Sequence, residues 1–318
     1  MTKQLDWTRR AFLRNVSAAL CTLAMAQTLS ASAAREVKRP TRFQIACMTL
    51  PYSRFPLKRA LEGIAASKFQ YVAWGTRHVA ASGERVPVLD LNAKPLQAKK
   101  LAARCRDLGL TPVMMFSTVS VEADGSVDGH KRRIEQAATA GIPQVLTFGS
   151  TKGGRYETWI RNLKELGPIA RAAGVTLVIK QHGGETATGK ATAKIIREVG
   201  DEGVGINYDA GNVMDYVNVD PIVDIRECVD EIRSFSIKDH RNFPEDQDCG
   251  PGFGEIDHYR LLELVAYTGL TMPLACENIF APLLPRPTTP EGVDILARRA
   301  REYLEVVVKG LQASAEKL

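Results

Sequence analysis

Residues 175–182 read VTLVIKQH, an apolar run that ends in a lysine and a histidine. Apolar and β-branched residues without alternation are typical of a parallel strand that is covered on both faces. Three later runs also end in polar residues: 204–212 (VGINYDAGN), 232–240 (IRSFSIKDH) and 273–278 (PLACEN). The carboxyl ends of such strands meet at one mouth when the strands close into a barrel, and that mouth carries the active site of a (β/α)8 barrel.

The rest of the chain continues the alternation of strands and helices. Strand-like runs occur near 43–48, 71–74, 112–116 and 144–148. The helix-like stretches lie at 57–67, 96–108, 131–140, 157–173, 192–199, 221–231, 259–267 and 291–309. About eight βα units in roughly 280 residues match the size of a barrel, so we predict an α/β fold, a (β/α)8 TIM barrel. A doubly wound open sheet is the main alternative, but no GxGxxG motif opens a helix after the first strand.

The first residues are expected to be a twin-arginine signal peptide. Arg9 and Arg10 stand in the pattern TRRAFLR, an apolar stretch follows at 16–29, and small residues occupy 31–33. The apolar stretch is shorter than the ~20 residues that a membrane-spanning helix needs. We therefore expect a signal peptide at 1–33, a barrel domain at 34–318, a periplasmic location and no stable membrane anchor.

The net charge predicts an ordinary soluble surface, and the cysteines give no disulfide pattern. The formal net charge is +6, and residues 1–33 hold four basic residues and one acidic residue, which leaves +3 for the remainder. A net charge of +3 is ordinary, and the sequence contains no basic stripe, so a nucleic-acid partner is not expected. The five cysteines after the signal are widely spaced, and the sequence assigns no disulfide among them.

The strand-end motifs resemble those of the xylose isomerase-like TIM barrels, a family of sugar and sugar-phosphate isomerases and epimerases with an endonuclease branch. The resemblance runs from about residue 43 to the C-terminus. Its specific motifs follow the family order: LVIKQH at 177–182, YDAGN at 208–212, FSIKD at 235–239, CGPGFGEID at 249–257 and LACE at 274–277. The resemblance implies a barrel enzyme acting on a small-molecule carbohydrate. The endonuclease branch is not favoured, because neither its zinc ligands nor a basic surface is visible.

The resemblance also implies a metal site, from which this chain departs. Isomerases of the family hold one divalent metal with Glu, Asp, His and Glu, and the matching positions are Lys180, Asp209, Ser236 and Glu277. An ammonium group repels a divalent ion and offers no lone pair while it is protonated. We therefore expect no metal cofactor. The alternative is a divalent metal (Mn, Mg or Zn) that His182 or Asn212 helps to coordinate.

Three roles for Lys180 remain open from the sequence. Its ammonium could take the place of the metal charge and stabilise an enolate or alkoxide oxygen. It could instead be a Schiff-base nucleophile of a lyase or dehydratase, if burial lowers its pKa. In the third role it is ion-paired to Asp209 and Glu277 in a barrel that binds carbohydrate without catalysis.

The remaining candidate residues fall into catalytic and substrate-binding groups. The catalytic candidates are Lys180, Asp209, Glu277 and His182, the last as an acid/base or as a donor to a hydroxyl group. The candidates for substrate binding are Lys238, Asn212, His240, Trp74 and His78. Trp74 could stack on a sugar or belong to the core, and His240 could face the pocket or lie outside it.

We therefore expect an exported sugar isomerase or epimerase that abstracts a proton next to a carbonyl group, without the usual metal of the family. Export argues against a phosphorylated sugar. Oligomerisation is compatible with the sequence.

Overall fold

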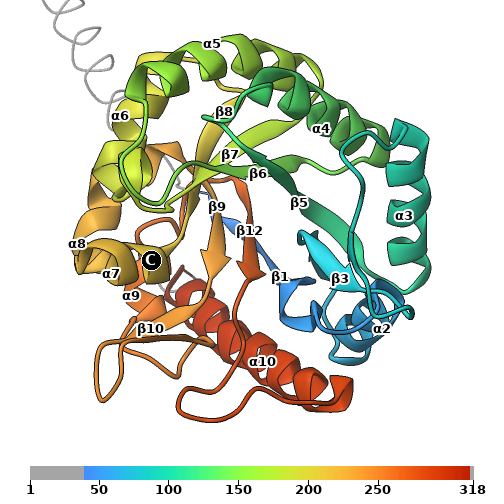
Figure 1. Cartoon of the computed structure of the whole chain (residues 1–318). Helices are drawn as coiled ribbons and strands as arrows, with labels where there is room; N and C mark the ends of the chain where they lie inside the picture. The colour runs from blue at the N-terminus through green and yellow to red at the C-terminus, as the bar shows by residue number, and fades with distance from the viewer. Residues whose placement is uncertain (1–38, 316–318) are drawn as a thin grey trace, which may run out of the picture. The chain divides into compact units, whose positions relative to one another are not determined.

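Eight parallel strands close into a barrel in the computed structural model, which describes residues 39–315 (Figure 1). Their order around the barrel is β1-β12-β9-β8-β7-β6-β5-β2, so the first and last strands in the chain pair with each other. The strands are β1 (Arg42–Met48), β2 (Tyr71–Trp74), β5 (Thr111–Ser120), β6 (Gln144–Phe148), β7 (Thr176–Lys180), β8 (Val204–Tyr208), β9 (Ile232–Ile237) and β12 (Thr271–Cys276). The predicted TIM barrel is confirmed.

Helices connect consecutive strands and surround the barrel (Figure 1). They are α2 (Leu57–Ala66), α3 (Pro95–Asp107), α4 (Ser126–Ala140), α5 (Tyr156–Ala172), α6 (Gly189–Val199), α7 (Ala210–Val217), α8 (Pro221–Asp224), α9 (His258–Glu263) and α10 (Pro290–Ala315). Two small antiparallel hairpins stand apart from the barrel sheet. They are formed by β3 (Arg77–Val79) with β4 (Arg85–Pro87) and by β10 (Asp239–Arg241) with β11 (Gln247–Cys249).

Two predicted helices are shorter than expected. The stretch 221–231 forms only α8, followed by two 3₁₀ turns, and the stretch 259–267 forms α9 from His258 to Glu263. The sequence does not predict α7, because its residues AGNVMDYV include Gly, Asn and Val, which are poor helix formers. Its N-cap, Asp209, compensates by accepting a hydrogen bond from the backbone N–H of Asn212 at 2.9 Å.

The interior of the barrel changes from apolar to polar along its axis. Alternate residues of each strand face inward, and an inner apolar cluster includes Val178 on β7 and Ala275 on β12. Lys180 and Glu277 each follow one of these residues by two positions, so both side chains point into the barrel at its carboxyl end. A second, larger core lies between the strands and the helices.

The expected signal peptide, residues 1–33, lies outside the described residues. Among residues 39–315, no helix combines the length and apolar character needed to cross a bilayer. All five cysteines of this part are buried and unpaired.

Candidate active site

A lysine and two carboxylates meet inside the mouth of the barrel. Lys180 Nζ donates to Glu277 Oε1 at 2.6 Å and to Oε2 at 2.5 Å. The same ammonium lies 3.0 Å from Asp209 Oδ2. The side chains of Lys180 and Asp209 are buried, whereas that of Glu277 remains 18% exposed. Glu277 is therefore the carboxylate of this group that a ligand entering from solvent meets first.

Asp209 is held firmly, yet one of its oxygens is left without a hydrogen bond. Its backbone N–H donates to Gln181 Oε1 at 2.9 Å, and its Oδ1 caps α7 by accepting from Asn212. Asp209 Oδ2 is close to Lys180 but has no hydrogen-bond partner among residues 39–315, so this contact is an ion pair without hydrogen-bond geometry. A buried acceptor of this kind is costly unless a proton or a ligand donor satisfies it.

The two carboxylates differ in proton affinity. Burial raises the pKa of Asp209 to about 6, although Lys238 and Lys180 oppose the rise. Burial would also raise the pKa of Glu277, but Lys180 and Lys238 outweigh it and hold this pKa below its usual value. Since both carboxylates share the same ammonium, we assign any proton bound by the pair to Asp209 and the charge to Glu277.

Lys180 stays charged in this environment. Burial favours the neutral amine, but Glu277 and Asp209 outweigh burial and raise the pKa of Lys180 above its usual value. A protonated amine cannot attack a carbonyl carbon, so the geometry favours a role for Lys180 as a fixed positive charge.

A second lysine, Lys238, lies beside this group. Its Nζ donates to Asn212 Oδ1 and, at 2.7 Å, to Asp248 Oδ2, and it lies 3.9 Å from Asp209 Oδ2. The stem of Lys238 passes close to α7, because a Cβ built on Gly211 would lie 2.6 Å from Lys238 Cε. Gly211 therefore makes room for the lysine.

The four strand-end positions do not form a metal site as they are arranged. The Lys180 ammonium engages the oxygens of Glu277 and approaches the free oxygen of Asp209. The hydroxyl of Ser236 donates to Asn207 Oδ1 at 2.6 Å, inside the barrel. Two carboxylates held by an ammonium do not supply the several free donors that a divalent ion requires. The expected absence of a metal at this position stays a prediction.

His182 belongs to an aromatic wall beside the ion-paired group. Its ring lies edge-to-face with Phe148 at 5.2 Å and with Tyr216 at 5.7 Å between ring centroids. Its Nδ1 lies 3.2 Å from the carbonyl oxygen of Gly149. Because that oxygen only accepts, Nδ1 carries the hydrogen, and burial lowers the pKa of the ring. His182 is thus neutral at pH 7, with Nε2 as an acceptor.

The other three candidates for substrate binding lie apart from Lys180. Trp74 belongs to the core between the strands and the helices, since its neighbour Ala73 faces the barrel interior. His78 is buried in the β3–β4 hairpin, where its Nδ1 lies 2.9 Å from the carbonyl oxygen of Phe55. His240 is buried on β10 and contacts Asp248.

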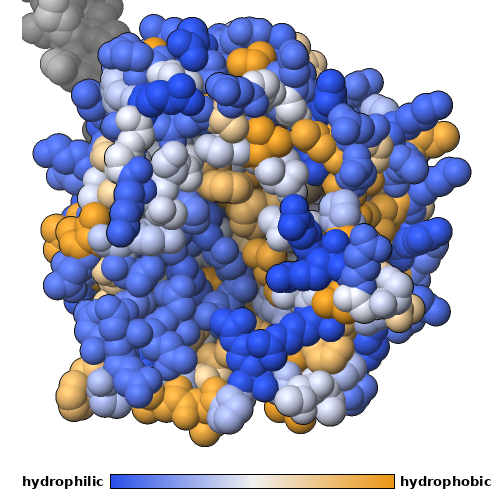
Figure 2. All heavy atoms as spheres, viewed as in Figure 1, coloured by the Kyte–Doolittle hydropathy of each residue, from blue (hydrophilic) through white to orange (hydrophobic). Residues whose placement is uncertain are grey.

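Two neighbours of the site, Gln181 and Asp248, are not among the residues that the sequence predicts, whereas Asp239 is expected there as the last residue of the FSIKD motif. Gln181 positions Asp209, Asp248 joins Lys238 to His240, and Asp239 organises the loop after β11. The alternation within the strand motif offers a signal for Gln181. Because Lys180 faces inward, the next side chain is expected to face away from the barrel interior. Nothing in the sequence distinguishes Asp248 from the other acidic residues of its loop. Figure 2 shows hydrophilic residues gathered over α7, α9 and β10, beside a hollow near the middle of this face.

Comparisons with known proteins place these observations in a wider context. A family model described as xylose isomerase-like TIM barrel matches residues 62–299. A solved xylose isomerase-like TIM barrel/4-hydroxyphenylpyruvate dioxygenase fusion protein is 19% identical with a TM-score of 0.65, and the match covers 87% of this chain and 44% of that one. The chain therefore spans less than half of the fusion protein.

Two further solved structures match over nearly their whole length. An L-ribulose 3-epimerase is 18% identical with a TM-score of 0.64, and the match covers 86% of this chain and 96% of that one. The IOLI protein, solved with a zinc atom, is 18% identical with a TM-score of 0.59, with 86% and 97% covered. At this identity the likenesses show a common fold. No curated protein matches the chain.

Proposed function

Because the chain belongs to the xylose isomerase-like TIM barrel family, we propose that it is an enzyme that moves a proton next to the carbonyl group of a sugar or sugar-derived keto compound. The observation that carries this proposal is the position of Lys180 Nζ, between Glu277 at 2.5 Å and Asp209 at 3.0 Å inside the barrel mouth. Similarity to an L-ribulose 3-epimerase supports the same class of reaction.

The two carboxylates have complementary roles in this proposal. Glu277 is partly exposed and has a lowered pKa, so it is charged at neutral pH and abstracts the proton from carbon. Asp209 has a pKa raised to about 6 and an oxygen without a hydrogen bond, so its protonated form, which prevails below pH 6 and is a minor fraction at pH 7, supplies a proton to the product. Pairs of carboxyl groups with separated pKa values are how one site holds an acid and a base.

Lys180 stabilises the oxygen of the enolate intermediate. Its ammonium contacts both Glu277 and Asp209, and an oxygen atom of the ligand that enters between these carboxylates would accept a hydrogen bond from it. The ammonium is already in place before charge develops, which is the condition for effective electrostatic catalysis in a buried site. His182 and Lys238 orient hydroxyl groups.

The charge balance favours a neutral substrate. Lys180 and Lys238 are both matched by carboxylates, and with Asp209, Glu277 and Asp248 the group carries three negative and two positive charges when all are ionised. A sugar phosphate would add negative charge beside two lysines that are already paired with carboxylates. The twin-arginine pattern supports the same conclusion, since a periplasmic enzyme meets free sugars.

Deuterium exchange tests the reaction even when the product is not identified. The chain lacking residues 1–33 is treated with a chelator and incubated in D2O with neutral ketoses and aldoses. Nuclear magnetic resonance then follows deuterium at the carbon next to the carbonyl group. We expect exchange with at least one sugar, its loss in Glu277→Gln, and normal exchange in the surface control Glu202→Gln.

Two outcomes contradict the proposal in different ways. Sugars that raise the melting temperature without any exchange would favour the non-catalytic carbohydrate-binding protein. Trapping of a sugar on Lys180 by borohydride would favour the Schiff-base lyase, because the reagent reduces an imine between the lysine and the substrate.

A further inference from the structure

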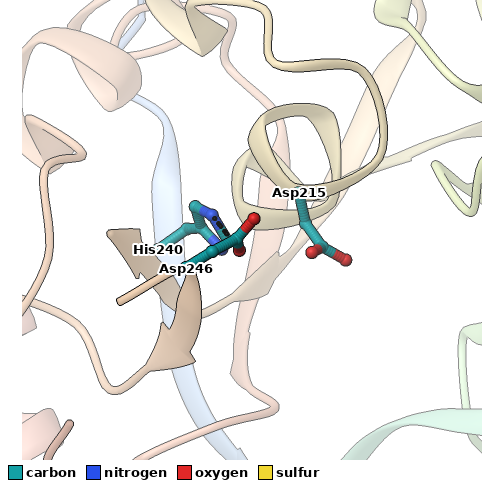
Figure 3. A group of neighbouring side chains, drawn as sticks. All are labelled: Asp215, His240 and Asp246. Atoms are coloured by element: carbon teal, nitrogen blue, oxygen red, sulfur yellow. Dashed lines mark ion pairs between the residues drawn. The ribbon is translucent and has the colours of Figure 1, made fainter. Parts of the chain in front are cut away.

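Three potential metal ligands from separate segments converge outside the Lys180 group. They are Asp215 on α7, His240 on β10 and Asp246 in the β10–β11 turn (Figure 3). One carboxylate oxygen from each aspartate and one ring nitrogen of the histidine all lie within 4.8 Å of one another. The His240 side chain is completely buried, whereas that of Asp246 is 70% exposed. The group therefore pairs a fixed nitrogen with solvent-accessible oxygens.

Asp248 fixes the orientation of the His240 ring. Its Nδ1 lies 3.1 Å from Asp248 Oδ1. A carboxylate accepts hydrogen bonds, so Nδ1 carries the hydrogen and the lone pair of the neutral ring is on Nε2. A histidine whose second nitrogen donates to a carboxylate is the usual arrangement of a metal-binding histidine. Burial keeps the ring from rotating away.

The Nε2 atom faces oxygens rather than a donor. It lies 3.3 Å from Asp246 Oδ1 and 3.3 Å from Asn242 Oδ1. In the neutral ring all three atoms are acceptors, so a cation or a proton is needed among them. Among residues 39–315, no basic side chain lies within 4.0 Å of the Asp215 carboxylate to form an ion pair with it.

We propose that Asp215, His240 and Asp246 bind one divalent transition-metal ion, with Zn²⁺ as the preferred ion. Tetrahedral zinc with bonds of about 2.0–2.1 Å places neighbouring ligand atoms about 3.3 Å apart. The distance from His240 Nε2 to Asp246 Oδ1 already has this value. The exposed carboxylate of Asp215 completes the set by a side-chain rotation, and water takes the fourth position.

This site is separate from the strand-end positions and does not depend on the proposed function. Asp248 is the link between them, because it contacts His240 through Oδ1 and Lys238 through Oδ2. A metal bound to His240 would therefore affect Lys238 at the barrel mouth through the hydrogen bonds of the Asp248 carboxylate.

Calorimetric titration of the chelator-treated chain with ZnCl₂ tests the proposal. We expect one Zn²⁺ per chain, and a weakening of at least tenfold in Asp246→Asn and in Asp215→Asn. These residues are exposed, so the variants should fold, and a thermal melt checks this. Asp124→Asn, an exposed aspartate on another loop, should bind as the parent does.

A second titration locates the ion. Glu277→Gln should leave zinc binding unchanged, and Co²⁺ bound in place of Zn²⁺ should give visible absorption that disappears in Asp246→Asn. Zinc binding that is lost in Glu277→Gln but kept in Asp246→Asn would overturn the proposal, because the ion would then be at the strand ends. Absence of saturable binding would overturn it as well, leaving a protonated His240 as the occupant of the gap.

Discussion

Lys180 ends β7 and Glu277 directly follows β12, a strand that is not a neighbour of β7, yet Lys180 Nζ approaches both carboxylate oxygens of Glu277, at 2.6 and 2.5 Å. Strands β8 and β9 separate β7 from β12 in the barrel. The ion pair therefore reaches across the mouth, and it places the Lys180 ammonium against Glu277, the one carboxylate of the Lys180–Asp209–Glu277 group that is partly exposed to solvent.

Removal of that charge should destabilise the fold. Lys180→Met leaves Asp209 and Glu277 close together without their shared counter-charge, and loss of one partner of a buried ion pair costs about 3–5 kcal/mol. We expect this decrease in the free energy of unfolding, measured with urea at pH 7. The exposed control Lys152→Met should change it by less than about 0.5 kcal/mol. Equal stability of both variants would show that the ion pair contributes nothing.

The raised pKa of Asp209 predicts a specific pH dependence. Between pH 4 and 6 the folded state retains a proton that the unfolded chain has released, so the stabilising contribution of Asp209 is present below pH 4 and is lost as the pH rises through about 6. Asp209→Asn lacks this titration. The difference in unfolding free energy, parent minus variant, should therefore fall between pH 4 and 6 and then level off. A difference that rises over this range would mean that the pKa is lowered.

The barrel and the Lys180 group could both be predicted from the sequence, for related physical reasons. Unbroken apolar runs indicate strands buried on two faces, and polar residues at their carboxyl ends meet in a closed barrel. Lys180, Asp209 and Glu277 are such residues, and their side chains are in contact. Their catalytic roles remain a proposal.

Side-chain direction and loop contacts are harder to predict. Trp74 ends a strand, as a site residue would, but one position of register decides between the interior and the helix-covered face, and β2 has an irregular register with β5 at Val72 and Ala73. Asp248 lies on β11, which pairs with β10 in an antiparallel hairpin. Strands of three residues are too short to show an alternation of polar and apolar residues in the sequence. Such contacts depend on tertiary structure.

Gly211 should be intolerant of even a methyl group. A Cβ at this position would lie 2.6 Å from Lys238 Cε and 2.7 Å from Cγ, so Gly211→Ala would push the lysine away from Asn212 and Asp248. Overpacking of this kind costs about 1–3 kcal/mol. We expect that loss in urea unfolding, together with weaker ligand binding in the exchange assay. Gly310→Ala, in α10, is the comparison, because its Cβ would meet Tyr259 Cε2 at 3.3 Å, a close contact but 0.7 Å longer than the 2.6 Å contact at Gly211. A stability gain in Gly211→Ala would show that Lys238 relaxes freely.

Asp239 should act on the loop rather than on substrate. Its Oδ1 accepts from the backbone N–H groups of His240 at 2.9 Å and Ile256 at 3.0 Å, and its Oδ2 accepts from Gly252 at 2.9 Å. Asp239→Ala leaves the buried N–H groups of His240 and Ile256 unsatisfied and removes the acceptor of the part-buried N–H of Gly252, and each buried unsatisfied group costs about 1–3 kcal/mol. We expect faster amide hydrogen exchange at Gly252 and Ile256 than in the parent.

The conservative variant separates this positioning role from a contribution of charge. Asp239→Asn keeps one acceptor oxygen, so it should restore protection at Ile256 or at Gly252 but not at both. Gly254 packs closely against this carboxylate, since a Cβ built there would lie 2.3 Å from Asp239 Oδ1. If hydrogen exchange in Asp239→Ala matched the parent at both amides, the loop would be held by its glycines and by packing, and the carboxylate would have no positioning role.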